Sequence, residues 1–221
     1  MKLTNTKELA QNQGVNILAY GLAGAGKTFS ISTYDGKPLI LSAEGGLLSL
    51  SQFDIDVIEV KSIDDMRKVY KHIATGDAPY DLLAIDSLSE LAESLLHHEL
   101  QAARDPRQAY GEVLTQITNL VREFRNLPIH CYFTCKMERT KDEFSGGLVC
   151  YPGLPGQKLG QTLPYLVDEV FCLRVEKNKE GETVRMFQTT SDEKYYAKDR
   201  SGKLGRFEPP NLTEIINKLK G

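Results

Sequence analysis

The stretch from Gly21 to Thr28, GLAGAGKT, constrains this chain more than any other segment, because it matches G-x-x-x-x-G-K-[ST] at every fixed position. The apolar run 15–20 precedes it and indicates a buried strand, and a predicted helix follows. Glycines let successive backbone N–H groups point at phosphate oxygens, and a helix N-terminus adds its positive dipole. The sequence therefore predicts a phosphate-binding loop, and residues 21–28 are called the phosphate loop below.

Two side chains of this loop and one carboxylate outside it have expected roles. Lys27 reaches the outer phosphates, and the Thr28 hydroxyl can coordinate Mg²⁺. Asp86 ends the apolar run 82–85, so we expect it at the same sheet edge as a second Mg²⁺ ligand, the alternative being a helix N-cap. The residues expected to bind the nucleotide are Gly21, Leu22, Ala23, Gly24, Ala25, Gly26, Lys27, Thr28 and Phe29.

Hydrolysis of a nucleotide also needs a group that orients or deprotonates water. Many P-loop ATPases carry a Glu directly after the Asp, but here that position is Ser87. Glu44 is the better candidate, because it follows the apolar run 39–43 and precedes two glycines, next to the expected γ-phosphate. An ordinary loop acid is the alternative, and Glu90, one helical turn beyond Asp86, is a weaker rival.

Short apolar runs alternate with segments of helical spacing through the first two thirds of the chain. The predicted strands cover residues 15–20, 38–43, 57–60, 80–86 and 129–135, and the predicted helices cover residues 63–73, 88–96 and 113–124. This alternation predicts an α/β fold with a mostly parallel central sheet and helices on both faces.

The last third of the chain has a different pattern. Residues 169–174 and 183–189 are strand-like, and the turn signal 178–181 joins them into a hairpin. A further strand at 195–197 and a final helix around 212–219 are also expected. No linker marks a second domain. We therefore expect an N-terminal arm over residues 1–14 and a single domain over 15–221.

Composition limits the classes of partner. With 27 Lys and Arg against 30 Asp and Glu, the net charge of −3 provides no global basic field, so any nucleic acid would meet a local patch or an oligomer. The four cysteines show no metal-binding spacing and are interpreted as free thiols. No signal-peptide pattern and no membrane-length apolar run is present, so a cytoplasmic protein without membrane contact is expected.

Four segments together resemble a known family: residues 21–28, 42–46, 80–87 and 197–200. They are similar to the RecA-like ATPase core and, more narrowly, to the small phage-encoded Sak-type ATPases that assist single-strand annealing and recombination. The resemblance spans about residues 15–210. It implies a RecA-like P-loop NTPase fold with a C-terminal antiparallel hairpin, ATP and Mg²⁺ as cofactors, and the cytoplasm of a bacterial host.

The resemblance also implies catalytic roles beyond Lys27. Glu44 matches the catalytic glutamate of RecA-like enzymes, and Lys136 matches the polar residue that senses the γ-phosphate, with a surface lysine as the alternative. Lys198 and Arg200 match a K-x-R pair that enters the neighbour's ATP site in a ring or filament. Positive charge there stabilises the phosphoryl transition state. A charged turn is the alternative for this pair.

Single-stranded DNA is the partner that the resemblance implies, contacted by two loops. Arg104 and Arg107 lie in the first, residues 104–110, and Arg139, Lys141 and Lys158 in the second, residues 138–158. Basic residues pair with phosphates, and an aromatic can stack on a base. Both loops also hold acids, so ordinary surface loops remain an alternative. A homo-oligomer and a single-strand-binding protein are further expected partners.

The leading hypothesis is thus a Mg²⁺-dependent ATPase, stimulated by DNA, that oligomerises on single strands and assists phage recombination or annealing. A P-loop small-molecule kinase is the second hypothesis, with residues 136–160 as its lid. A non-hydrolysing ATP switch that loads or regulates a partner is the third.

Overall fold

The computed structural model describes residues 5, 6, 8, 13–141 and 146–221, so most of the predicted arm at 1–14 lies outside it. Within the described residues, one ten-stranded sheet has the order β10-β8-β7-β1-β5-β4-β2-β3, with β6 paired to β5 and β9 paired to β7. The strands are β1 (Asn16–Gly21), β2 (Pro38–Ser42), β3 (Asp56–Glu59), β4 (Leu82–Asp86), β5 (His130–Lys141), β6 (Leu148–Gly153), β7 (Glu169–Lys177), β8 (Thr183–Gln188), β9 (Lys198–Asp199) and β10 (Phe207–Glu208).

The centre of the sheet is parallel and its additions are antiparallel. β7, β1, β5, β4, β2 and β3 pair in parallel, in that order. The β5–β6, β7–β8, β7–β9 and β8–β10 pairs are antiparallel. The predicted fold class, a mostly parallel sheet with a C-terminal antiparallel hairpin, is confirmed. Parallel strands end at one edge, so the residues after β1, β2 and β4 meet there.

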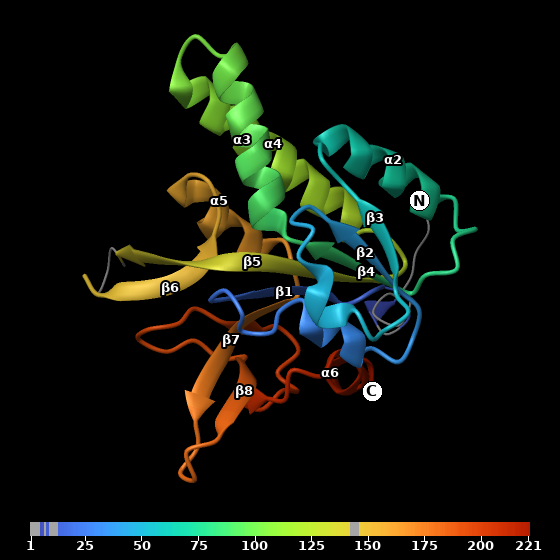
Figure 1. Ribbon diagram of the computed structural model, residues 1–221, viewed down its shortest axis with the longest axis vertical. Coiled ribbons are helices and arrows are strands. Elements are labelled where there is room, and N and C mark those ends of the chain that lie inside the picture. Colours follow the sequence, from blue (N-terminus) through green and yellow to red (C-terminus); the bar gives the residue numbers. More distant parts are fainter. Residues whose placement is uncertain (1–4, 7, 9–12, 142–145) are drawn as a thin grey trace.

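Helices cover both faces of the sheet (Figure 1). The helices α2 (Ile63–Ala74), α3 (Leu88–Ala102) and α4 (Pro106–Phe124) pack on one face, and α6 (Leu212–Lys220) packs on the other with the 3₁₀ turn η1 (Phe29–Thr33). The alternation along β4 shows why: Leu83 and Ile85 belong to the first core, Leu82 and Ala84 to the second. A strand buried on both faces is an unbroken apolar run.

The helix expected after the phosphate loop is only the short 3₁₀ turn η1. Its sequence, FSIST, is rich in hydroxyl and β-branched residues, which are poor helix formers. The hydroxyls of Ser30 and Thr33 donate to the carbonyls of Lys27 and Ser30 three residues back, and Pro38 follows closely. The chain therefore turns into β2 after one short turn.

The segment 136–160, expected as a loop or a kinase lid, is instead ordered secondary structure. β5 continues past the sheet edge to Lys141 and pairs with β6 in a long hairpin, and α5 (Gln157–Thr162) follows. Met137, Val149 and Cys150 supply the apolar positions that the sequence pattern did not reveal as a strand pair. The further strand expected at 195–197 is only an isolated bridge from Tyr195 to Cys150, and the strand β9 begins at Lys198.

The four cysteines, interpreted from their spacing as free thiols, lie in the core. All four cysteines are free and buried, and burial raises the pKa of the Cys131 thiol to about 12. In the part of the chain that the structure describes, no helix is long and apolar enough to cross a membrane.

Candidate nucleotide-binding site

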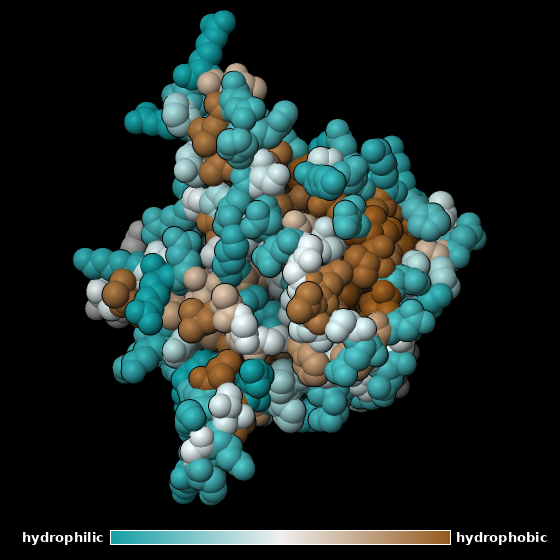
Figure 2. All heavy atoms as spheres, in the orientation of Figure 1, coloured by the Kyte–Doolittle hydropathy of each residue, from teal (hydrophilic) through white to brown (hydrophobic). Residues whose placement is uncertain are grey.

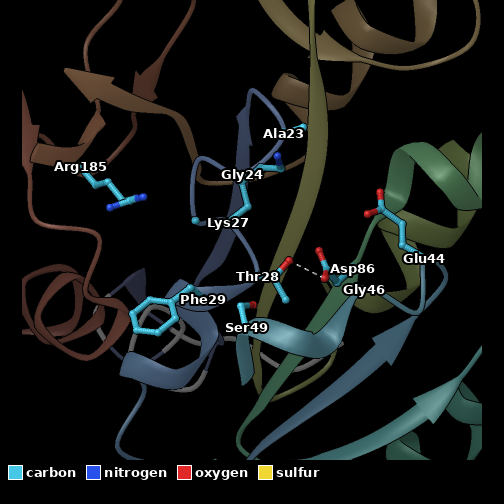
Figure 3. Close-up of a pocket in the computed structure, with 11 residues that line it drawn as sticks. Ala23, Gly24, Lys27, Thr28, Phe29, Glu44, Gly46, Ser49, Asp86 and Arg185 are labelled. Carbon is cyan, nitrogen blue, oxygen red and sulfur yellow. Dashed lines mark hydrogen bonds between the residues drawn. The ribbon is translucent and has the colours of Figure 1, made fainter. Parts of the chain in front are cut away.

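A pocket of about 570 Å³ opens at the carboxyl ends of β1, β2 and β4 (Figure 3). Its walls come from the phosphate loop, the first residue of η1, the segment that joins β2 to β3, the end of β4 and one residue of β8. The lining residues are Ala23, Gly24, Gly26, Lys27, Thr28, Phe29, Glu44, Gly46, Ser49, Asp86 and Arg185. The topology thus assembles one site from segments that are far apart in the sequence.

Two glycines give the phosphate loop backbone conformations that other residues rarely adopt. Gly24 and Gly26 have φ values of +71° and +112°, which side-chain-bearing residues rarely adopt. Of the predicted loop residues, Gly21, Leu22 and Ala25 do not line the pocket. A Cβ on Gly21 would lie 2.9 Å from a backbone oxygen of β7, so this glycine allows close strand packing rather than ligand contact.

Lys27 places a cation inside the loop. Its ammonium donates to the carbonyls of Gly21 and Leu22, at 2.9 and 3.1 Å. Burial lowers the pKa of Lys27, while the Asp86 and Glu44 carboxylates oppose that shift. Two neutral carbonyls are weaker partners for an ammonium than phosphate oxygens, so the lysine is ready to exchange them for a ligand.

Three oxygen-bearing side chains meet beside Lys27. The Thr28 hydroxyl donates to Oδ2 of Asp86 at 2.8 Å, and the Thr134 hydroxyl donates to Oδ1 at 2.5 Å. The helix α3 is capped by Ser87, which accepts from the backbone N–H of Glu90, so the N-cap reading of Asp86 is wrong. A buried carboxylate beside a threonine hydroxyl is a set of hard oxygen donors, and this chemistry fits Mg²⁺.

Glu44 faces the same pocket from the turn after β2 (Figure 3). The hydroxyl of Ser87 donates to Oε1 of Glu44 at 2.5 Å. The remaining oxygen of this exposed carboxylate can accept a proton from a water molecule. Its rival Glu90 does not line the pocket and accepts from Lys136 instead.

The comparisons with known proteins agree with this geometry. The family model described as "AAA domain" matches residues 13–201. The chain belongs to this AAA domain family. It is therefore a P-loop ATPase by family, an NTP hydrolase class that ordinarily uses ATP and Mg²⁺.

Among curated proteins, none matches the chain. A solved structure, the KaiC-like protein PH0186 from the hyperthermophilic archaeon Pyrococcus horikoshii OT3, is similar with 17% identity and a TM-score of 0.44, covering 79% of this chain and 77% of that chain.

Lys136 does not reach the pocket of this AAA domain. Its ammonium lies 2.7 Å from Glu93 and 3.1 Å from Glu90, and these hydrogen bonds to α3 raise its pKa. In this structure Lys136 therefore lies outside the pocket in which a γ-phosphate contact was expected. Lys136 lies at the sheet edge, in register with Gly21, where the acids of α3 attract it. Thr134, two residues earlier on β5, is the polar residue that meets Asp86.

Lys198 and Arg200 lie at the opposite edge of the sheet from the pocket. Lys198 pairs with Val170, which faces Leu18, three residues or about 10 Å before the end of β1. Neither side chain reaches the pocket of its own AAA domain. The Lys198 ammonium donates to the carbonyls of Pro164 and Val167, whereas the Arg200 guanidinium is exposed and pairs with Asp168 at 3.0 Å.

Two side chains near the pocket were not expected from the sequence. Arg185 of β8 lines it and donates from Nε to the carbonyl of Ala25 at 3.1 Å. Tyr132 of β5 lies beneath the loop, with its buried hydroxyl 2.8 Å from the Ser30 hydroxyl and 3.2 Å from the Lys27 carbonyl. A lone polar residue in the apolar run 131–135 could have indicated Thr134, but no local signal marks Arg185.

Most of the predicted DNA-contact residues lie on helices and a hairpin rather than in two loops. Arg107 and Lys158 line one groove of about 330 Å³ between α4 and α5, together with the exposed ring of Tyr110. Arg104 is exposed in the turn before α4 and does not line that groove.

Arg139 and Lys141 lie two residues apart on β5, so they share one face of the β5–β6 hairpin. The predicted second loop also includes residues 142–145, which lie outside the described residues.

Proposed function

We propose that this protein is a Sak-type, Mg²⁺-dependent ATPase that assembles into homo-oligomers on single-stranded DNA and assists phage recombination or strand annealing in the cytoplasm of a bacterial host. The observation that carries the proposal is the convergence of Lys27, Thr28, Asp86 and Glu44 on one pocket. Membership of the AAA domain family supports the hydrolase part.

Each of these side chains has a defined task on bound ATP. Lys27 and the backbone N–H groups of the phosphate loop bind the outer phosphate oxygens. Thr28 and Asp86 would hold the metal ion, which when bound neutralises phosphate charge. Glu44, oriented by Ser87, accepts the proton of the attacking water. Tyr132 holds the end of the loop in position through its hydroxyl.

The oligomer part rests on what the pocket lacks. No described side chain outside the loop other than Arg185 brings positive charge to the pocket, and Arg200 lies at the far edge. Because Arg200 is exposed and a surface ion pair is worth about 0–1 kcal/mol, it can leave Asp168 for a neighbour's phosphates. A second copy that presents its far edge to this pocket would complete the site.

The surface beside the pocket also supports contact with a second copy. Leu22 of the phosphate loop is 66% exposed, and Leu48, in the segment that joins β2 to β3, is 90% exposed. Figure 2 shows apolar side chains gathered over the region where β2 and β3 lie in Figure 1. Apolar side chains that gather on an exposed surface are typical of a binding surface.

The DNA part rests on the groove between α4 and α5. Arg107 and Lys158 supply cations that can pair with backbone phosphates, and Tyr110 supplies an aromatic face on which a base can stack. Arg139 and Lys141 extend the basic surface along the hairpin. β5 forms one strand of this hairpin, and Thr134 of the same strand contacts Asp86. One strand therefore connects the nucleotide pocket to the basic residues of the hairpin.

Phosphate release from ATP, measured with and without single-stranded oligonucleotide over a range of protein concentrations, tests the proposal. We expect the specific activity to rise when single-stranded oligonucleotide is added and when the protein concentration is raised. Negligible turnover under every condition would instead favour the non-hydrolysing switch. Phosphate transfer that requires an added small-molecule acceptor would favour the kinase. Duplex DNA of the same length serves as the control for single-strand preference.

A further inference from the structure

Two planar side chains line the nucleotide pocket at the end away from Glu44. Phe29 is the first residue of η1, directly after Thr28, and Arg185 comes from β8 (Figure 3). Neither belongs to the metal or water-activating part of the site. Both side chains are therefore free to contact another part of a bound nucleotide.

The direction of the triphosphate follows from the other residues. The terminal phosphate belongs beside Lys27, Asp86 and Glu44, because the metal ligands and the proton acceptor lie there. The sugar and base must then extend in the other direction, past the end of the phosphate loop. Phe29 and Arg185 line this end of the pocket.

Phe29 is unusually open for a large apolar side chain, with 43% of its surface exposed. Phe53 packs edge-on against it, with ring centroids 6.0 Å apart and planes at 74°. This contact orients the Phe29 ring and leaves part of it accessible. An oriented, accessible aromatic ring in a polar pocket is suited to stacking on another planar group.

Arg185 is positioned but has no acidic partner. Its Nε donates to the carbonyl of Ala25, and its Cδ lies 3.4 Å from where a Cβ on Gly26 would be, so its stem packs on the loop. Within the described residues it forms no ion pair. Its guanidinium plane is available to a ligand, and such planes stack on aromatic faces.

We propose that Phe29 and Arg185 form the base subsite of this pocket and hold the nucleotide base through its faces. The inference rests on the proposed ATP-binding function. Because stacking does not read the hydrogen-bonding edge of a base, ATP and GTP should bind within about tenfold of each other. Pyrimidine nucleotides, with a smaller face, should bind more weakly.

The test compares ATP with inorganic tripolyphosphate, which has the phosphates but no base. Dissociation constants are measured by calorimetry with Mg²⁺ for wild type, Phe29→Ala and Arg185→Ala. Loss of a stacking partner should weaken ATP binding about 5- to 100-fold and leave tripolyphosphate binding unchanged. Phe29→Trp should retain ATP binding, because it keeps an aromatic face.

Matched controls come from the same chain. Phe207→Ala removes a ring that is also 43% exposed, on β10, and Arg206→Ala removes an exposed arginine beside it. Both should leave the two ligands unaffected. Equal losses for ATP and tripolyphosphate, or no loss for either, in the Phe29 and Arg185 variants would overturn the subsite. A wild-type protein that binds neither ligand would instead overturn the proposed function itself.

Discussion

The hydroxyl of Ser87 donates a 2.5 Å hydrogen bond to Oε1 of Glu44, and so joins the ends of two neighbouring parallel strands, β2 and β4. Ser87 occupies the position directly after Asp86, where many P-loop ATPases carry their glutamate. The carboxylate comes from the next strand instead, and Ser87 orients it. Under the proposed function, Glu44 is the proton acceptor of the site, although the usual position lacks one.

Glu44→Gln keeps the shape of this side chain but removes its basicity. We expect normal ATP binding and a decrease in kcat of about 10²-fold or more, the usual size of a general-base contribution. Single-turnover and steady-state rates measure the effect. Glu90→Gln is the control, because Glu90 pairs with Lys136 outside the pocket. Full activity of Glu44→Gln together with an inactive Glu90→Gln would show that Glu44 is the wrong glutamate.

Arg200→Ala should be inactive yet still bind ATP through its own Lys27. Mixed with Lys27→Ala, it should recover part of the activity, because some interfaces then combine an intact pocket with an intact arginine. Turnover of the mixture, against each variant alone, is the measurement. If mixing gives no rescue and the activity of wild type does not depend on concentration, Arg200 is a surface residue and the oligomer model is wrong.

Arg107→Gln with Lys158→Gln should weaken binding of single-stranded DNA. Each lost phosphate contact should lower the slope of log affinity against log salt by about 0.7. Fluorescence anisotropy at several salt concentrations measures both quantities. Arg122→Gln is the control, since Arg122 is exposed near the other end of the same helix. Unchanged affinity and slope in the double variant would remove the groove from the DNA-binding surface.

The turn that carries Lys198 and Arg200 covers a buried acid, Glu169. Burial raises the pKa of Glu169 to about 8, with the facing Asp199 adding to the shift. Because the folded pKa exceeds the unfolded value of 4.5, the proton on Glu169 stabilises the fold fully below pH 4.5, and this contribution is lost as pH rises toward 8.

Glu169→Gln should remove this pH dependence. Relative to the variant, the free energy of unfolding of wild type should fall between pH 5 and 8, by at most about 1.4 kcal/mol per pH unit, the value for one proton. Urea unfolding across that range measures it. Burial lowers the pKa of the neighbouring Lys198 to about 8, so its effect lies mainly above this window. Parallel curves for the two proteins would contradict the prediction.

The sequence predicted best those parts of the site that directly follow a recognisable strand. The phosphate loop, Asp86 and Glu44 each follow a short apolar strand, and parallel strands end at a common edge, so their meeting could be predicted without coordinates. The main strands and helices could also be predicted, because a strand buried on both faces gives a short apolar run and an amphipathic helix gives apolar residues at steps of three and four.

The remaining features depend on long-range pairing. Arg185 reaches the pocket because β8 pairs with β7 and β7 with β1, and nothing within β8 encodes that neighbourhood. Lys136 pairs with Glu93 of α3 and Thr134 contacts Asp86, and both contacts depend on where β5 leaves the sheet edge and on the acids of α3, which lie outside the motif. The β5–β6 hairpin was missed because neither of its strands has a clean alternation.

In the proposed function, one pocket built by Lys27, Thr28, Asp86 and Glu44 hydrolyses ATP with Mg²⁺. The most direct measurement is the initial rate of phosphate release for wild type, Lys27→Ala and Asp86→Asn, with Mg²⁺ and with excess chelator. Lys37→Ala, an exposed lysine outside the pocket, is the control and should keep the wild-type rate. We expect Mg²⁺-dependent release for wild type and Lys37→Ala, and loss of release for Lys27→Ala and Asp86→Asn. Rates equal to wild type in Lys27→Ala or Asp86→Asn would contradict it.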